Sequence, residues 1–249
     1  RLDLSQDAGE SSKYVKVNKA GRRIDEDEDE DEDDGPLPNN SILGSGGFAV
    51  TYRMRCLLDG QLRAVKVVKA KKAQQNGMNL EAMQRETHIL NTLTHEHIVR
   101  YYASFFEGPS ANPQKYFYIV MSYVDGDQLY DHIQKNAPAN TILEWARQLA
   151  SALAYMHRKG FQHRDLKSQN VMVSADGKDV VVIDLGLACA SHTSGVVSKL
   201  GTDVYMSKEK AMGDRYGPGD DMWALGCMLA ELACRQPLTG ALWGDSAQS

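Results

Sequence analysis

The stretch Leu43–Val50, "LGSGGFAV", is a glycine-rich turn between two segments that have the residue pattern of strands. Glycine allows a backbone to approach a bound group closely and to adopt conformations that are closed to other residues. Such a turn is either a flexible joint or a cradle of backbone N–H groups for phosphates. Its glycine content alone leaves both interpretations open, and the residues that follow distinguish them.

Two charged residues occupy positions at which the surrounding pattern predicts burial. Residues Met54–Val68 form two apolar runs around an Asp-Gly turn, which predicts a β-hairpin, and Lys66 lies in the second run. Residues Leu80–Leu93 have helical spacing, and Glu86 falls on their apolar stripe. A buried charge is rare without a partner. Pairing Lys66 with Glu86 resolves both anomalies.

The remaining elements are strands followed mainly by helices. Residues Tyr116–Val124 are predicted as a buried strand, and a second hairpin is predicted around Asp176-Gly177. Residues Asp220–Leu232 are apolar nearly all round, which predicts a helix buried at the centre of a core. This order of elements predicts an α+β protein in two lobes.

The strongest helix prediction covers Thr141–Gly160. Thr141 and Glu144 have the spacing of a capping box, and Gly160 has the character of a helix end. An apolar face is predicted from helical spacing: Leu143, Ala146, Leu149, Leu153 and Met156.

Composition places the 249-residue chain among globular proteins, at 42% hydrophobic residues. No apolar run reaches the roughly 18 residues of a membrane helix, so no membrane partner is expected. The four cysteines lack metal or disulfide spacing and predict free thiols. We therefore expect an intracellular protein, in the cytoplasm or in the nucleus or on the cytoskeleton, with no nucleic-acid partner.

The net charge of −5 conceals an uninterrupted acidic block, because Asp25–Asp34 is ten acidic residues in a row. Such a block repels itself and buries no apolar area, so residues 1–36 are predicted to be disordered. The block is either a solubilising tail or an electrostatic partner for a basic surface, including one on the same chain.

Seven motifs follow one another along the chain: "GSGGFA", "AVKVV", "QRETHIL", "HRDLKSQN", "DLG", "GTDVYMSKE" and "DDMWALG". In this order and at these separations they resemble the eukaryotic protein kinases, from about Asn39 to the C-terminus. Each motif alone is weak, whereas the seven together are specific. The last motifs most resemble the NIMA-related kinases.

The resemblance implies a two-lobed α+β kinase fold and a Ser/Thr protein kinase that uses ATP and Mg²⁺ on protein substrates. The implied parts are an N-lobe at 37–121, a hinge at 122–126 and a partial C-lobe at 127–249. The C-lobe is expected to be incomplete, because the family continues beyond the point at which this sequence stops, Ser249.

The resemblance also implies catalytic roles. Asp165 corresponds to the base that accepts the substrate's hydroxyl proton, and Lys167 and Thr202 to the Ser/Thr-kinase residues around it. Lys66 is implied to reach the α- and β-phosphates and to pair with Glu86. Asn170 and Asp184 are the implied Mg²⁺ ligands, and this pair suits a cation that takes few protein ligands.

The implied nucleotide site draws on several strands, with Leu43 as a roof over adenine and Met172 as a floor. The other implied ATP-binding residues are Gly44, Ser45, Gly46, Gly47, Phe48, Ala49, Thr51, Ala64, Lys66, Met121, Ser122, Tyr123 and Val124. Ala49 replaces the family's third glycine, and Thr51 stands where valine is usual. Neither change is expected to disable the loop.

Regulation by phosphorylation is a further implication. Ser198 lies four residues before Thr202, a common activating position, and Thr193 is a second candidate. Arg164 precedes Asp165 and could pair with a phosphate there; the alternative is that these are ordinary loop hydroxyls.

Two other functions remain open. One is a pseudokinase that binds without transferring phosphate, which an incomplete C-lobe favours and the intact catalytic set opposes. The other is an interaction protein that acts through Asp25–Asp34.

Overall fold

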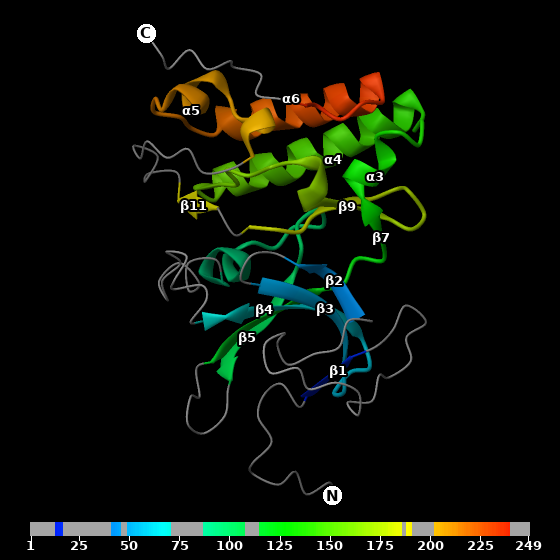
Figure 1. Ribbon diagram of the computed structural model, residues 1–249, viewed down its shortest axis with the longest axis vertical. Coiled ribbons are helices and arrows are strands. Elements are labelled where there is room, and N and C mark those ends of the chain that lie inside the picture. The colour runs from blue at the N-terminus through cyan, green and yellow to red at the C-terminus, as the bar shows by residue number, and fades with distance from the viewer. Residues whose placement is uncertain are drawn as a thin grey trace, which may run out of the picture. The chain divides into compact units, whose positions relative to one another are not determined.

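The computed structural model describes residues 13–16, 41–45, 49–70, 87–107, 115–185, 188–190 and 202–239, in two compact units (Figure 1). Unit 1 comprises Arg1–Thr87 and Tyr101–Tyr123, and unit 2 comprises His88–Arg100 and Val124–Ser249. Residues 88–100 are grouped with unit 2. The cause is backbone pairing, since Val99 N–H donates to Val182 O at 2.8 Å and Val182 N–H donates to His97 O at 3.0 Å.

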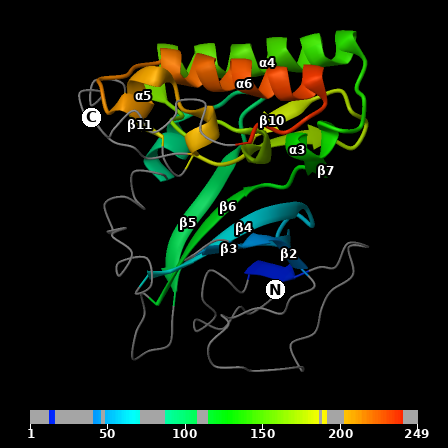
Figure 2. The same cartoon turned by 45° about the horizontal axis from the view of Figure 1, so that its top comes forward.

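Unit 1 is built on a six-stranded antiparallel sheet. Its order is β1-β3-β4-β6-β5, and β2 also pairs with β3 (Figure 2). The strands are β1 (Tyr14–Lys16), β2 (Ile42–Ser45), β3 (Ala49–Cys56), β4 (Leu62–Lys69), β5 (Tyr101–Glu107) and β6 (Tyr116–Ser122). The hairpin predicted between β3 and β4 is present, and Gly60 takes the positive φ of 69° that its turn requires.

One face of this sheet carries an apolar core, because alternate residues of a strand point to the same side. The core residues are Tyr52, Met54, Val65, Val67, Tyr118 and Val120. Tyr52 pairs with Val65, and Val65 with Val120, so the three lie in one row across β3, β4 and β6.

Strand β1 lies inside the segment that was expected to be disordered. Tyr14 pairs with Cys56 and Lys16 with Met54, and the Tyr14 side chain packs against the apolar core. The ordering follows from local composition: Tyr14-Val15 is β-forming and precedes the charge block. The block itself, Asp25–Asp34, lies outside the described residues.

Unit 2 combines small sheets with helices. Strands β7 (Gly126–Gln128), β9 (Val171–Ser174) and β10 (Val180–Val182) form one antiparallel sheet in the order β10-β9-β7, and β8 (Phe161–Gln162) pairs with β11 (Cys189–Ala190). The helices are α3 (Leu129–His132), α4 (Ala139–Arg158), α5 (Lys208–Met212) and α6 (Gly219–Cys234), with short 3-10 turns η3 (Ser168–Asn170) and η5 (Asp203–Tyr205). Helices α4 and α6 run side by side in both ribbon views (Figures 1 and 2).

Helix α4 confirms the predicted helix and corrects its start. It begins at Ala139 after the N-cap Pro138, so the predicted capping box is wrong. Glu144 instead accepts hydrogen bonds from Arg147 and Gln148, and the Arg147 bond is the main cause that lowers the Glu144 pKa to about 2. Leu143 was predicted on the apolar face but is 69% exposed, because the helix turns Trp145 inward.

Of the rest of the predicted α4 face, Leu149, Leu153 and Met156 are fully buried, and Ala146 is partly buried. Gly160 ends the helix with a φ of 80°, as expected. Helix α6 is less enclosed than predicted. Its Leu225 and Met228 are buried, but Met222 and Trp223 are 47% and 39% exposed. Among the described residues, no helix is long and apolar enough to cross a membrane.

We predict that Gly126→Ala weakens unit 2. Gly126 has a φ of 155°, and a Cβ there would lie 1.9 Å from Val173 O of the neighbouring strand β9. Strain of this kind costs on the order of 1–3 kcal/mol, which lowers the melting midpoint of a chain of this size by roughly 3–10 °C. Thermal melts followed by circular dichroism measure the change. Gly217→Ala is the control, because a Cβ there meets nothing within 4 Å; equal melting of the two variants would contradict the prediction.

Candidate active site

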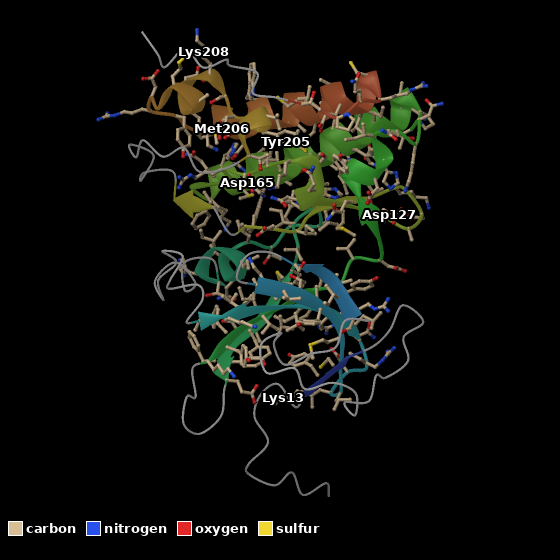
Figure 3. All side chains as sticks on the ribbon, in the orientation of Figure 1. Lys13, Asp127, Asp165, Tyr205, Met206 and Lys208 are labelled. Carbon is tan, nitrogen blue, oxygen red and sulfur yellow. The ribbon has the colours of Figure 1, made fainter. Side chains whose placement is uncertain are left out.

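Asp165 is the centre of a cluster of polar side chains in unit 2 (Figure 3). Thr202 donates to its Oδ1 twice, from the backbone N–H and from Oγ1, each at 3.0 Å. The Lys167 ammonium lies 3.1 Å from Oδ2 and donates to Thr202 Oγ1 at 2.9 Å. The structure therefore brings together the three residues that the sequence placed around a proton acceptor.

The β9–β10 hairpin brings Asn170 and Asp184 to one end of a sheet. Asn170 directly precedes β9, Asp184 follows β10, and Val171 pairs with Val182. Ile183 N–H also donates to Asn170 O at 3.0 Å, which fixes the two chain ends beside each other. The predicted metal ligands thus come from neighbouring backbone, although they are fourteen residues apart in sequence.

The donor set at this end of the hairpin fits Mg²⁺. Asn170 Nδ2 donates to Asp165 O at 2.9 Å and lies 3.4 Å from Asp165 Oδ2, which leaves the amide oxygen as the atom for a cation. An amide oxygen and a carboxylate are hard ligands of the kind that Mg²⁺ takes, usually one or two from protein with the rest from phosphate and water. Among the described residues, no group of three or more His, Cys, Asp or Glu side chains is arranged so that it could hold a metal ion.

The loop that carries Asp165 is fixed by hydrogen bonds to one buried carboxylate. Asp221, at the start of α6, accepts the backbone N–H groups of His163 and Arg164, each at 2.9 Å, and His157 Nε2 lies 2.7 Å away. Burial alone would raise the pKa of Asp221, but these hydrogen bonds and the nearby His163 ring together lower it. The carboxylate therefore stays ionised and keeps accepting from all three groups.

The loop also contains backbone strain. Arg164 has a φ of 70°, a left-handed conformation that costs a non-glycine residue roughly 1–2 kcal/mol. Its side chain is held as well, because Nε donates to the Tyr216 hydroxyl at 2.9 Å. A strained residue beside a candidate catalytic group persists only where its surroundings fix it.

His163 is a buried residue of the same loop. It is 1% exposed, and its Nδ1 accepts the Asp165 N–H at 3.3 Å. Burial lowers the pKa of His163 more than the three nearby carboxylates raise it, so the ring is neutral near pH 7. A neutral ring can accept the hydrogen bond that turns the Asp165 backbone.

A second buried network lies beside the first. Tyr205 of η5 donates to Glu231 Oε2 at 2.8 Å and lies 2.9 Å from Ser168 Oγ, and Leu238 N–H donates to Glu231 Oε1 at 2.9 Å. Burial is the main cause that raises the pKa of Tyr205, so its hydroxyl keeps its proton. The network joins the loop after Asp165 to helix α6, and Figure 3 shows Tyr205 and Asp165 in the same part of unit 2.

In unit 1 the predicted nucleotide residues share the sheet face opposite the apolar core. Thr51 pairs with Lys66, and Ala64 pairs with Met121, so these four alternate with core residues along β3, β4 and β6. Ala49 follows the same alternation, two residues before Thr51. Strand β2 places Gly44 opposite Thr51 and Ser45 opposite Val50.

The other predicted nucleotide residues lie in both units. Leu43 is 43% exposed on β2. Ser122 is the last residue of β6, and Tyr123 ends the second chain segment of unit 1. Val124 begins the second segment of unit 2. Met172 lies on β9 and is partly exposed, whereas Val171 and Val173 on either side are fully buried. Six predicted residues fall outside the described part of the chain: Gly46, Gly47, Phe48, Glu86, Thr193 and Ser198.

Sequence reasoning assigned no role to several residues of the site. Asp221, Tyr205 and Glu231 lie in the segments "GTDVYMSKE" and "DDMWALGCMLAEL", which served only to identify the family resemblance. Asp221 had a usable signal, because two acidic residues open an otherwise apolar helix. His157 carried none, since it reads as an ordinary residue of the last turn of α4.

Comparison with known proteins gives a consistent result. Residues 38–248 match the family model described as the protein kinase domain. The chain is 32% identical over 197 residues to the serine/threonine-protein kinase Nek8 of Danio rerio, covering 77% of this chain and 27% of that protein. It is 35% identical over 202 residues to the serine/threonine-protein kinase PknB of Mycobacterium leprae (79% and 32%). It is 31% identical over 204 residues to the SNF1-related protein kinase catalytic subunit alpha KIN12 of Arabidopsis thaliana (80% and 40%). The chain thus spans less than half the length of these relatives, and the α+β fold expected from the sequence is confirmed.

We predict that Asp221→Asn destabilises unit 2 in a pH-dependent way. An amide presents an NH₂ group to donors that now meet a carboxylate, so at pH 7 the free energy of unfolding falls by about 2–3 kcal/mol. The folded-state pKa of Asp221 lies below its ordinary value of 3.8, so its stabilisation is complete above that pH and is lost as pH falls through the folded-state pKa. The difference between wild type and variant should therefore shrink below pH 3.8.

Urea unfolding between pH 3 and pH 7 measures this difference. The exposed Asp214→Asn is the matched control and should leave stability unchanged. A difference for Asp221→Asn that stays constant over the whole pH range would contradict the assignment.

Proposed function

The chain belongs to the protein kinase family, and on that premise we propose that it transfers the γ-phosphoryl group of Mg–ATP to serine or threonine hydroxyls of proteins. The single observation that carries the proposal is the cluster of Asp165, Lys167 and Thr202 at the end of a hairpin that also holds Asn170 and Asp184. Phosphoryl transfer asks the protein mainly to position the acceptor oxygen and to neutralise phosphate charge. This cluster has groups for both tasks.

Asp165 is the proposed acceptor of the substrate's proton. Thr202 donates twice to Oδ1, and Lys167 and Asn170 contact Oδ2. Two carboxylate oxygens offer about four lone-pair sites, and these four contacts take them up and orient the group. A substrate hydroxyl would displace the longest of them, the 3.4 Å contact from Asn170. The side chain is 15% exposed, which gives a hydroxyl access.

Lys167 and Thr202 support the choice of serine or threonine as acceptor. The Lys167 ammonium bridges Asp165 and Thr202 and is 24% exposed, so it is available to a phosphate oxygen near the acceptor. In the sequence, this lysine is the feature that favours a Ser/Thr kinase over a tyrosine kinase. The Ser/Thr kinases among the similar proteins agree with that choice.

Bound Mg²⁺ supplies charge neutralisation for the phosphates, and Asn170 and Asp184 would hold it. We assign ATP binding in unit 1 to the sheet face that carries Thr51, Lys66 and Met121. Met172 is assigned to ATP by the sequence resemblance alone. Lys66 offers a cation to the phosphates, and the proposed pairing with Glu86 belongs to the same assignment. The small Ala64 and the β-branched Thr51 leave the sheet face flat enough for an adenine ring.

Finer assignments are parts of the same proposal. A NIMA-related identity rests on the motifs "HRDLKSQN", "GTDVYMSKE" and "DDMWALG", and similar proteins also include bacterial and plant kinases. Phosphorylation at Ser198 or Thr193 would place negative charge in the segment before Thr202, and Arg164 is the implied partner for that charge. An intracellular location and a basic partner for Asp25–Asp34 complete the proposal.

We predict that Asp165→Asn abolishes transfer while leaving ATP binding intact. Loss of a general base lowers the rate by roughly 10²–10⁴-fold. Transfer of radiolabelled phosphate to a basic protein measures the rate, and a fluorescent ATP analogue measures binding. Asp214→Asn should match wild type. Wild-type protein that binds ATP but transfers nothing would contradict the kinase assignment and indicate a pseudokinase.

We also predict that Thr202→Val lowers kcat and leaves the KM for ATP unchanged. Valine keeps the shape and the backbone N–H but removes the hydroxyl that links Lys167 to Asp165, so the carboxylate loses one of its two Thr202 contacts. Misplacement of a catalytic group lowers the rate by about 10–100-fold. Thr202→Ser restores the hydroxyl and should recover most of the rate; steady-state kinetics in which Thr202→Val equals wild type would refute the role.

A further inference from the structure

We propose that Lys210 is a positioning residue of the catalytic loop, which it holds through the backbone carbonyl of Arg164. This role rests on the phosphoryl transfer proposed above and adds a residue to it. Lys210 lies on α5, outside every residue set that the sequence identified, and its side chain is 2% exposed. A lysine is almost never buried to this extent unless it is paired.

The Lys210 ammonium has two oxygen partners. It forms an ion pair with Asp220 Oδ2 at 2.9 Å, and it donates to the carbonyl oxygen of Arg164. The Asp220 carboxylate is itself fixed, because its Oδ1 accepts the Ser207 N–H at 3.1 Å. The Lys210 ammonium therefore links Asp220 of α6 to the backbone of the loop that carries Asp165.

The carbonyl that Lys210 contacts belongs to the peptide group that leads directly into Asp165. The N–H of that same peptide group belongs to Asp165 and donates to His163 Nδ1 at 3.3 Å. Rotation of this peptide would turn the Asp165 side chain away from Thr202. Lys210 and His163 thus hold its two polar ends.

Asp220 and Asp221 fix different backbone groups of Arg164. Asp221 accepts the Arg164 N–H directly, whereas Asp220 orients the lysine that reaches the Arg164 carbonyl. Arg164 has a φ of 70°, so the loop would relax toward an ordinary conformation if either side were released. The pair of acidic residues at the start of α6 explains how the strained conformation is kept.

Stability alone does not account for this ion pair. A buried ion pair is on average no more stabilising than apolar residues of the same volume, because desolvation offsets the attraction between the charges. What an apolar pair cannot do is donate a hydrogen bond to the Arg164 carbonyl. The Tyr216 ring, whose centroid is 5.2 Å from the ammonium, closes the site and is shared with the Arg164 side chain, so both cations are fixed against one ring.

Three variants of the chain test the role. Lys210→Met removes the ammonium and leaves the Asp220 charge buried without it. Lys210→Met with Asp220→Asn removes both charges but keeps an oxygen that can accept the Ser207 N–H. Lys208→Met is the control, because Lys208 is an exposed lysine on the same helix (Figure 3). The measurements are kcat, the KM for ATP, the urea midpoint, and hydrogen exchange of the Asp165 amide.

Lys210→Met should have a lower kcat and a lower urea midpoint than wild type. The double variant should recover most of the midpoint, because no uncompensated charge remains. Its kcat should stay about tenfold or more below wild type, with the KM for ATP unchanged. Its Asp165 amide should exchange about tenfold faster than in wild type. Lys208→Met should match wild type in every measurement.

Recovery of kcat together with the midpoint in the double variant would overturn the proposal, because the pair would then be structural only. Wild-type protein without transfer activity would refute the proposed function instead. In that case, hydrogen exchange of the Asp165 amide still tests the positioning role of Lys210. Faster exchange in the double variant supports that role, and unchanged exchange refutes it.

Discussion

The candidate active site depends on the buried negative charge of Asp221. A carboxylate removed from water must find hydrogen-bond donors, and here the donors are two consecutive backbone amides of the loop before Asp165 together with His157. The charge of the Asp221 side chain thus fixes the shape of this main-chain segment. Every contact of Asp165 with Thr202, Lys167 and Asn170 requires that shape, because it decides where the Asp165 side chain starts.

The sequence predicted well wherever a local rule was sufficient. Both Asp-Gly hairpins formed as expected, and Gly60 and Gly177 take the positive φ that only glycine adopts easily. The residues around Asp165 were found through motif order, and the structure brings Thr202 to Asp165 and Lys167 across more than thirty residues of chain. The order of the motifs identifies the residues of such a tertiary arrangement but does not show the contacts that hold them together.

The predictions that did not hold are those in which several local solutions competed. Thr141 and Glu144 had the spacing of a capping box, yet helix α4 begins earlier, at Ala139 after the N-cap Pro138, and Glu144 accepts a hydrogen bond from Arg147. The buried ion pair of Lys210 and Asp220 was not predicted, because no helical periodicity signals an ion pair between residues on two different helices. Burial of that kind is decided by tertiary packing, which the sequence pattern alone does not show.

The pairing of β1 with β3 changes how the acidic segment should be pictured. Strands β1 and β2 both pair with β3, so the chain that carries Asp25–Asp34 is covalently attached at each end to one sheet. Such a connection acts as a tether that supplies a high local concentration of β1 at its docking edge. A single proteolytic cut between the two strands would turn β1 into a separate peptide. It would be held by three residue pairs, the hydrogen bond from Leu57 N–H to Lys13 O and the packing of Tyr14, and its retention would then depend on dilution.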